Sequence, residues 1–325
     1  MRVITRRPNA NGFTYYDGDA AVTDSTVIDR IDQLAIPPAW SDVRIARSKT
    51  AKVQARGYDA AHRLQYIYHS AFRDQQDKAK FNRMLGFAKA LPRLRRQIDH
   101  DLSRRRLSKP KVLACVLKLI DTQFFRVGNE QYAREHGSYG ITTLRSKHAD
   151  ITTTAVTFDF MGKSGKHHVK TIKDRQLAHI IKQLDEMPGY EIFRYLDSEG
   201  VLHDIHSSDV NAYIKQYMGE DYTAKDFRTW GGTLLATSAI LEAELEASSS
   251  ATAKKRAMSA VVRSVAKRLG NTPAVARASY IDPRVFAAFE DEQSLQKVKK
   301  AMQRMRPKRY MSVEEQCVLT VLSAD

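Results

Sequence analysis

The stretch Phe72-Arg-Asp-Gln-Gln-Asp-Lys78 separates two parts of the chain that have different hydrophobic patterns. Before it, apolar and polar residues alternate in Val43-Arg-Ile-Ala-Arg47 and Leu64-Gln-Tyr-Ile-Tyr68, as they do in strands. From about Lys78 onwards, apolar residues recur at every third or fourth position, as they do in helices. We therefore expect an α+β protein with a small β-rich N-terminal domain, residues 1–76, and a mostly α-helical domain, residues 77–325.

Helical spacing is clearest in five segments of the second part, over residues 81–90, 112–135, 173–186, 208–219 and 254–269. Ser208 is a candidate N-cap, and Gly219 is a candidate stop signal for the same helix. Ser248-Ser-Ser250 has the composition of a short flexible linker.

The composition indicates a protein that binds a polyanion. The 325 residues carry a formal net charge of +16, and the basic residues are spread along the chain rather than confined to a tail. Such a balance favours nucleic acid over an anionic membrane surface as the partner. Two cysteines, Cys115 and Cys317, form no disulfide framework, and the N-terminus lacks an apolar signal core. We expect a cytoplasmic protein without a membrane span.

A β-hairpin is expected within the helical part, with Gly162-Lys-Ser-Gly165 as its turn. Gly162-Lys163-Ser164 mimics the end of a phosphate-binding loop, but the leading glycine of that motif would fall on Thr157. The segment that follows has strand alternation, so no helix N-terminus is available to hold phosphates. Lys163 is then either a solvated turn lysine or a mobile cation at the hairpin tip that can give a proton to a phosphate ester.

Two arginines occur beside aromatic residues, in Phe124-Phe-Arg126 and in Phe227-Arg228-Thr-Trp230. Anchored guanidinium groups can form bidentate bonds with phosphate oxygens. The alternatives are that Arg126 pairs with Glu130 or extends to solvent, and that Arg228 is held by Asp226 or stacks near Trp230.

Tyr280 ends the run Leu269-Gly-Asn-Thr-Pro-Ala-Val-Ala-Arg-Ala-Ser-Tyr280 and is followed by Ile281-Asp-Pro283. Since proline limits helical continuation, the tyrosine is expected near a helix end, where its phenol can project. A phenol has a pKa near 10 and needs activation to act as a nucleophile, which nearby guanidiniums would provide. Taken by itself, the residue would be interpreted as a packed core or surface tyrosine.

Two further patterns have a less specific meaning. In a strand, Tyr66 and Tyr68 share one face and Gln65 takes the other, which suits either contacts with DNA bases or sheet packing. His203-Asp-Ile-His206 lacks a matching ligand cluster, so we interpret it as a loop and predict no metal site.

Taken together, these motifs resemble the type IB DNA topoisomerases, specifically the small poxvirus-like enzymes found in bacteria. Phe-Phe-Arg126-x-Gly resembles the first catalytic arginine, and Phe160-Met-Gly-Lys163 resembles the lysine general acid. Lys225-Asp-Phe-Arg228-Thr-Trp-Gly matches the second arginine, and Leu269-Gly-Asn271-Thr-Pro with Arg277-Ala-Ser-Tyr280 matches the nucleophile block. The frames occur in the family's order over nearly the whole chain.

The resemblance also assigns DNA contacts and marks one departure. Arg63-Leu-Gln65-Tyr66-Ile-Tyr68 is similar to the family's major-groove strand, and Tyr132, Thr143 and Lys225 fall where the family touches DNA. Poxvirus and eukaryotic members carry histidine where this chain has Asn271. An amide can still donate to a phosphate oxygen, but no titrating imidazole is available at this position.

The implied activity is relaxation of positive and negative supercoils by a monomer that encloses double-stranded DNA in a C-shaped clamp. Tyr280 would form a 3′-phosphotyrosine, with Arg126, Arg228 and Asn271 stabilising the transition state and Lys163 protonating the leaving oxygen. The resemblance implies no metal, ATP or other cofactor, no membrane, and a location at the nucleoid. A tyrosine recombinase and a non-catalytic architectural DNA-binding protein are the alternatives.

Overall fold

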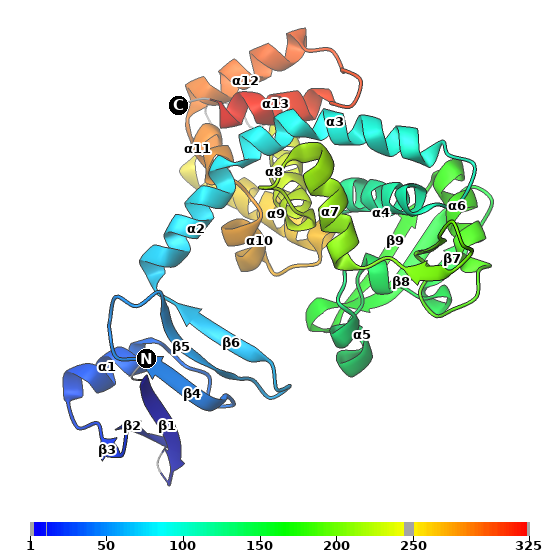
Figure 1. The fold of residues 1–325 in the computed structure, drawn as a ribbon. Helices are drawn as coiled ribbons and strands as arrows, with labels where there is room; N and C mark the ends of the chain where they lie inside the picture. The colour runs from blue at the N-terminus through cyan, green and yellow to red at the C-terminus, as the bar shows by residue number, and fades with distance from the viewer. Residues whose placement is uncertain (1–2, 11, 244–249, 324–325) are drawn as a thin grey trace. The chain divides into compact units, whose positions relative to one another are not determined.

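A computed structural model describes residues 3–10, 12–243 and 250–323. It divides the chain into two compact units, Met1–Asn82 and Arg83–Asp325. The division expected after residue 76 falls inside helix α2, Ser70–Asn82, which belongs to the first unit. The predicted α+β class is confirmed, since strands dominate the first unit and helices the second (Figure 1).

The N-terminal unit is built on an antiparallel sheet with the strand order β3-β2-β1-β4-β5-β6. The strands are β1 Val3–Asn9, β2 Gly12–Asp17, β3 Ala20–Ala21, β4 Ser41–Ala46, β5 Val53–Tyr58 and β6 Leu64–Tyr68. Helix α1, Ser25–Gln33, buries Ile31 against Ile4, Val43 and Ile45 of the sheet. The strands predicted from alternation at Val43 and Leu64 are therefore confirmed as β4 and β6.

Helices that pack around a common core dominate the second unit. They are α3 Met84–Leu102, α4 Lys109–Gln123, α5 Glu130–His136, α6 Arg175–Asp185, α7 Ser207–Met218, α8 Ala224–Glu242, α9 Ala251–Leu269, α10 Pro273–Ser279, α11 Pro283–Glu290, α12 Glu292–Arg304 and α13 Val313–Leu322. Short 3-10 turns are η1 Ile141–Thr143, η2 Ser146–His148 and η3 Lys163–Gly165.

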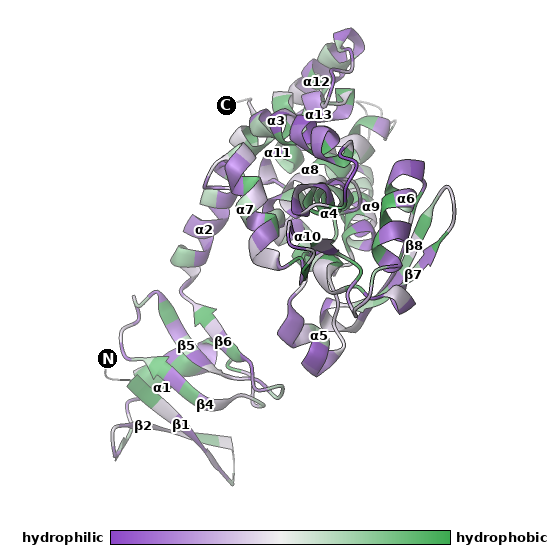
Figure 2. Cartoon of the chain, turned by 45° about the vertical axis from the view of Figure 1, so that its right-hand side comes forward, coloured by the Kyte–Doolittle hydropathy of each residue, from purple (hydrophilic) through white to green (hydrophobic). Residues whose placement is uncertain are grey.

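Helix α8 links the two apolar clusters of this unit. Its first half buries Phe227 and Trp230 against α3 and α4, where Phe87 meets both rings edge-on or tilted. Its second half buries Ala236 and Ile240 against α9, α11 and α13. Apolar residues concentrate on the inward faces of these helices (Figure 2). A residue on α8 therefore has a position set by packing on both sides.

The predicted hairpin is present within a three-stranded sheet of order β7-β8-β9. Strands β8, Val156–Gly162, and β9, Lys166–Ile172, are joined by η3, and β7, Ala149–Ile151, pairs with β8. Strand β9 begins at Lys166, so the expectation that a strand rather than a helix follows the Gly162-Lys-Ser segment is confirmed. A second hairpin, β10 Arg194–Leu196 with β11 Leu202–Asp204, was not predicted, since each strand has only three residues.

Some helix boundaries differ from the predictions. The helix expected over 112–135 is wrong, because α4 ends at Gln123 and Phe124 adopts a left-handed conformation with φ 56° and ψ 38°. The N-cap of α7 is His206 rather than Ser208. Ser250 caps α9 by accepting a hydrogen bond from the Ala253 amide, and Ser248 and Ser249 lie outside the described residues.

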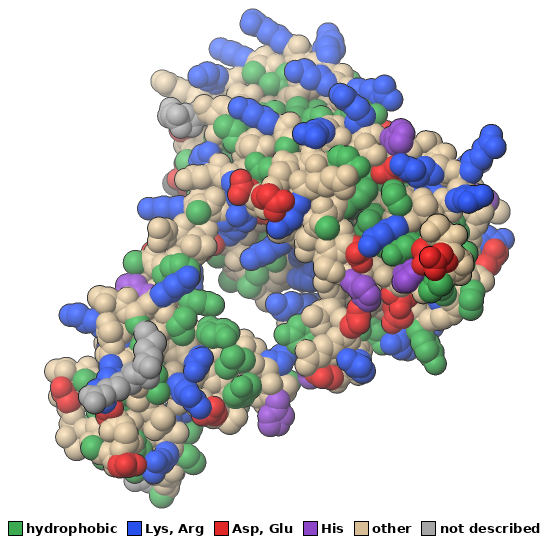
Figure 3. All heavy atoms as spheres, viewed as in Figure 1, with side chains coloured by type: hydrophobic (Ala, Val, Ile, Leu, Met, Phe, Trp, Pro, Cys, Tyr) green, Lys and Arg blue, Asp and Glu red, His purple; other side chains and the backbone are tan. Residues whose placement is uncertain are grey.

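Basic side chains are spread over the visible surface of the helical unit, and several project from the region of α3 and α12 (Figure 3). Within the described ranges, no helix combines the length and apolar character needed to cross a membrane.

Candidate active site

Arg126 lies in the loop that leaves α4, and its neighbours hold this loop in place. The left-handed turn at Phe124 ends the helix, and the Phe125 ring is 1% exposed between Phe158 and Phe160 of β8. On the other side, the Phe124 ring packs against Gly231 of α8, where an added Cβ atom would lie only 2.3 Å from Cε1 of the ring. The glycine thus allows α8 to approach the arginine loop closely. Glu130 contacts His206 instead, so the alternative that Arg126 pairs with Glu130 is wrong.

Arg228 is 4% exposed in the first half of α8, and its guanidinium crosses to two other segments. Nη1 donates to the Phe124 carbonyl at 2.6 Å, and Nη2 donates to the Leu269 carbonyl at 2.8 Å. Asp226 does not hold Arg228, because its carboxylate accepts from Arg83 and caps the helix start at Thr223. Arg228 therefore joins the end of α4 to the end of α9.

Asn271 lies between the two arginines. Helix α9 ends at Gly270, which is left-handed with φ 63° and ψ 48°, and this turn directs Asn271 towards the guanidiniums. Its Oδ1 accepts from Nη2 of Arg228 at 2.6 Å and from Nη2 of Arg126 at 3.3 Å. With the oxygen engaged by two cations, the amide Nδ2 is the group that can donate to a further ligand.

Tyr280 is the C-cap residue of α10, as expected from the proline at position 283, which begins α11. Its ring centroid lies 5.0 Å from Cζ of Arg228. The backbone beside it contacts α8, because a Cβ atom on Gly232 would lie 2.4 Å from the Tyr280 carbonyl oxygen. The Thr233 hydroxyl donates to this oxygen and accepts from the Asp282 amide. Helix α8 thus positions the tyrosine backbone as well as Arg228.

The charges of these groups favour the phenolate form of Tyr280. Burial opposes ionisation of the phenol, but the positive charges of Arg228, Arg126 and Lys225 outweigh it and lower the pKa of Tyr280 below its usual value. Conversely, burial and the like charge of Arg228 lower the pKa of Arg126 to about 10. Two guanidiniums held this close constitute a site for an anion.

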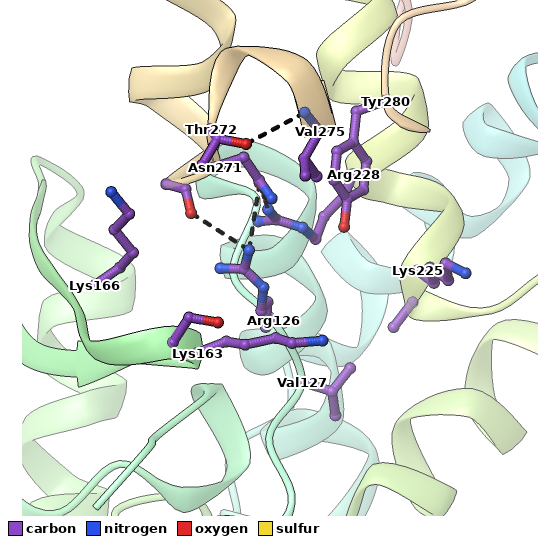
Figure 4. A pocket seen from close by; sticks show the side chains of 13 residues that line it. Arg126, Val127, Lys163, Lys166, Lys225, Arg228, Asn271, Thr272, Val275 and Tyr280 are labelled. Atoms are coloured by element: carbon purple, nitrogen blue, oxygen red, sulfur yellow. Dashed lines mark hydrogen bonds between the residues drawn. The ribbon is translucent and has the colours of Figure 1, made fainter. Parts of the chain in front are cut away.

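A pocket of about 590 Å³ contains the complete predicted catalytic set, and its opening is formed by the residues that Figure 4 labels. Arg126, Lys163, Arg228, Asn271 and Tyr280 all line it, with Lys163 extended from the hairpin tip into the same opening. The predicted DNA-contact residue Lys225 also lines it, together with Lys166 and Ser164. The structure therefore brings together residues from the loop after α4, the β8–β9 hairpin, α8, the α9–α10 connection and the end of α10.

The other predicted DNA-contact residues lie elsewhere. Tyr66 and Tyr68 are 43% and 38% exposed and stack on each other, while the Gln65 amide donates to Asp59. Tyr132 is exposed on α5. Thr143 is 1% exposed, and its hydroxyl bonds only to the Gly140 backbone among the contacts of the described chain. For each of these five residues, contact with DNA stays a prediction.

Local sequence patterns did not reveal three glycines that shape the site: Gly231 and Gly232, which let α8 approach the neighbouring segments, and Gly270, which ends α9. The Gly-Gly pair within a helical pattern was the available signal, since glycine in a helix interior is unfavourable without a packing reason. In the part of the chain that the structure describes, no three His, Cys, Asp or Glu side chains gather as a metal site requires. His203 instead contacts Asp197.

Comparisons with known proteins identify the family of the chain. The sequence model of the family "Eukaryotic DNA topoisomerase I, catalytic core" matches residues 69–309, and that of "Bacterial DNA topoisomerase IB, N-terminal domain" matches residues 12–59. The chain belongs to the type IB DNA topoisomerases, which are DNA-binding isomerases.

Among individual relatives, the chain is similar to the DNA topoisomerase 1B of Acanthamoeba polyphaga mimivirus, with 34% identity over 288 residues that cover 86% of this chain and 85% of the relative. It is also similar to the DNA topoisomerase 1B of vaccinia virus (strain Copenhagen), with 22% identity over 285 residues that cover 85% of this chain and 86% of the relative. The N-terminal match to the bacterial domain places the chain with the bacterial members.

Proposed function

We propose that the protein relaxes positive and negative DNA supercoils through a transient 3′-phosphotyrosine at Tyr280. The observation that carries the proposal is the pocket in which a phenol of lowered pKa meets Arg126, Arg228 and Asn271. A scissile phosphate bound in this pocket would supply the negative charge that the two guanidiniums need as a partner. The phenolate oxygen attacks phosphorus, the bond to the 5′-oxygen breaks, and the strand with the 5′-hydroxyl rotates before it attacks the phosphotyrosine in reverse.

Each side chain has a separate task in this proposal. Arg126 and Arg228 bind non-bridging oxygens and stabilise the additional charge of the pentacoordinate transition state. The Asn271 amide donates to the same phosphate from Nδ2, because Oδ1 is already bound by both arginines. Lys163 at the hairpin tip protonates the leaving 5′-oxygen, which would otherwise depart as an unstable alkoxide. The phosphotyrosine retains the energy of the broken bond, so we expect relaxation to require neither ATP nor a metal.

We further propose that both units contact duplex DNA. In the N-terminal unit, the exposed Tyr66 and Tyr68 on β6 offer aromatic faces for bases or sugars, and Gln65 offers an amide for adenine. Enclosure of the duplex by the two units as a C-shaped clamp, action as a monomer, and work at the cytoplasmic nucleoid belong to the same proposal.

The test is plasmid relaxation in EDTA without ATP, at a DNA excess. We expect both negatively and positively supercoiled plasmid to relax, and denaturant-trapped samples to contain protein joined to a 3′ DNA end. The Tyr280→Phe variant should bind the same DNA without forming this adduct, because phenylalanine has no nucleophilic oxygen. A folded wild type that is inactive under these conditions would disprove the proposal. Strand exchange between two duplexes without relaxation would indicate a recombinase, and binding alone an architectural protein.

A further inference from the structure

His168 does not line the pocket described above, yet it contacts two of the segments that carry pocket residues, at Gly162 and at Gly270. It lies on β9, opposite Phe160 in the β8–β9 register, and its ring stacks on the Phe160 ring at 5.2 Å between centroids. The side chain is half-buried. Its neighbour His167 points to the other face of the strand and contacts Asp159 at the surface.

Two glycines make room for the His168 ring. A Cβ atom on Gly162 would lie 2.6 Å from Cδ2 of the imidazole, and a Cβ atom on Gly270 would lie 2.1 Å from its Cε1. The ring thus fills the space between the end of β8 and the end of α9. Any side chain at either glycine would collide with it.

The residues that follow these two glycines both line the pocket. Lys163 comes directly after Gly162, and Asn271 comes directly after Gly270. The Gly270 carbonyl also accepts a hydrogen bond from Nη2 of Arg126 at 3.4 Å. One planar ring therefore separates the segment that carries Lys163 from the segment that carries Asn271 and supports Arg126.

We propose that His168 is a positioning residue whose ring sets the separation between the Lys163 turn and the Asn271 loop. This inference rests on the proposed function. The ring acts by its shape, as a spacer, and it touches neither the phosphate nor the leaving oxygen. Burial and the positive charges of Lys170, Arg126 and Arg228 lower the pKa of His168 to about 4, so the spacer is uncharged at neutral pH.

The experiment measures single-turnover cleavage at saturating DNA with two substrates. One carries the natural 5′-oxygen at the scissile bond, and the other carries sulfur in its place, which leaves without a proton and so bypasses Lys163. The variants are His168→Ala, which removes the ring, and His168→Phe, which keeps a planar ring. His167→Ala on the opposite face is the matched control. Thermal unfolding and DNA affinity are measured for each variant.

We expect His168→Ala to cleave the oxygen substrate about 10- to 100-fold more slowly, since small displacements of catalytic groups have effects of this size. The defect should be smaller on the sulfur substrate, because placement of Lys163 no longer matters there. His168→Phe should restore most of the rate, and His167→Ala should resemble the wild type. A merely structural loss would slow both substrates equally.

Three results would overturn the inference: His168→Ala cleaving like His167→Ala, equal slowing on both substrates, or no recovery in His168→Phe. Because His168→Phe retains the bulk of the side chain, the comparison holds even if His168→Ala is poorly folded. A wild type that forms no adduct with either substrate would instead contradict the proposed function, so the two failures are distinguishable.

Discussion

At the scale of single residues, the site places like charges together where no anion compensates them. Arg126 and Arg228 share the Asn271 oxygen as an acceptor, and no carboxylate accepts from either guanidinium in the described contacts. Backbone carbonyls and one side-chain amide accept some of the hydrogen bonds that the guanidiniums donate, but these neutral groups do not compensate the positive charge. Repulsion between the two cations raises the free energy of the site when it holds no anion. A bound phosphate or a phenolate lowers it.

The lowered pKa of Tyr280 leads to a prediction about pH. Since nearby cations stabilise the phenolate, the phenol should lose its proton at lower pH than an ordinary tyrosine, and removing one cation should raise that pH. The ultraviolet difference between wild type and Tyr280→Phe isolates this one phenol from the other tyrosines. In an Arg126→Ala background the same difference should move to higher pH. It should stay in place in the control background Arg134→Ala, which removes an exposed cation on α5. An unchanged or lower transition in Arg126→Ala would contradict the assigned electrostatics.

At the scale of elements, α8 organises the site. It carries Arg228. Its Gly231 packs against the Phe124 ring, and its Gly232 packs against the Tyr280 backbone. The C-terminal helix α13 supports α8 from behind, because Glu315 accepts from Trp230 Nε1 and from Arg95 of α3. Arg95 also binds Asp121 of α4 through Nε and Nη2. The segment after the nucleophile therefore completes the core beneath the site.

The close approach at Gly232 gives a prediction for Gly232→Ala. A methyl group there would collide with the Tyr280 backbone, so the nucleophile or α8 must shift. We expect single-turnover cleavage to fall by about 10²-fold, as displacements near 1 Å do, and stability to fall by about 1–3 kcal/mol from overpacking.

The matched control is Gly86→Ala in α3, where the added methyl group would meet only the Tyr222 hydroxyl, the tip of a movable side chain. That variant should cleave normally, and the higher helix propensity of alanine offsets its local crowding. Equal cleavage by the two variants would show that the Gly232 contact does not position Tyr280.

At the scale of the whole molecule, the net charge of +16 predicts that DNA binding weakens as the salt concentration rises. Binding that neutralises several phosphates releases counterions, so the affinity of the Tyr280→Phe variant should fall by about 10³-fold or more between about 50 mM and about 200 mM salt. Replacing Lys166 or Lys225, which line the pocket, with glutamine should each reduce the slope of log affinity against log salt by about one.

Fluorescence anisotropy with a labelled duplex measures this dependence, and Lys300→Gln on α12, which does not line the pocket, is the control. A flat salt response of the parent variant would argue against phosphate neutralisation as the basis of binding. A slope reduced equally by the α12 variant would argue against the pocket as the place where the phosphates bind.

The sequence by itself determined the class of fold, several of the elements and the set of residues that meet in the pocket. Alternation and helical spacing are local properties, so they predicted β4, β6, the β8–β9 hairpin and most of α9. The frames around Arg126, Lys163, Arg228, Asn271 and Tyr280 identified the pocket residues because their order along the chain is specific. Thr143 shows the limit of such frames, because the motif order did not reveal that its side chain is buried and bonded to the Gly140 backbone.

Only the tertiary structure decided how these residues are held. The apolar periodicity continues past Phe124, but helix α4 ends there in a left-handed turn, because the Phe124 ring packs against Gly231 on another helix. The contacts of Gly232 with Tyr280 and of His168 with Gly162 and Gly270 join segments that are distant in sequence. Periodicity reports which face of an element is buried, but not which neighbour covers it, and the distances between catalytic groups depend on that neighbour.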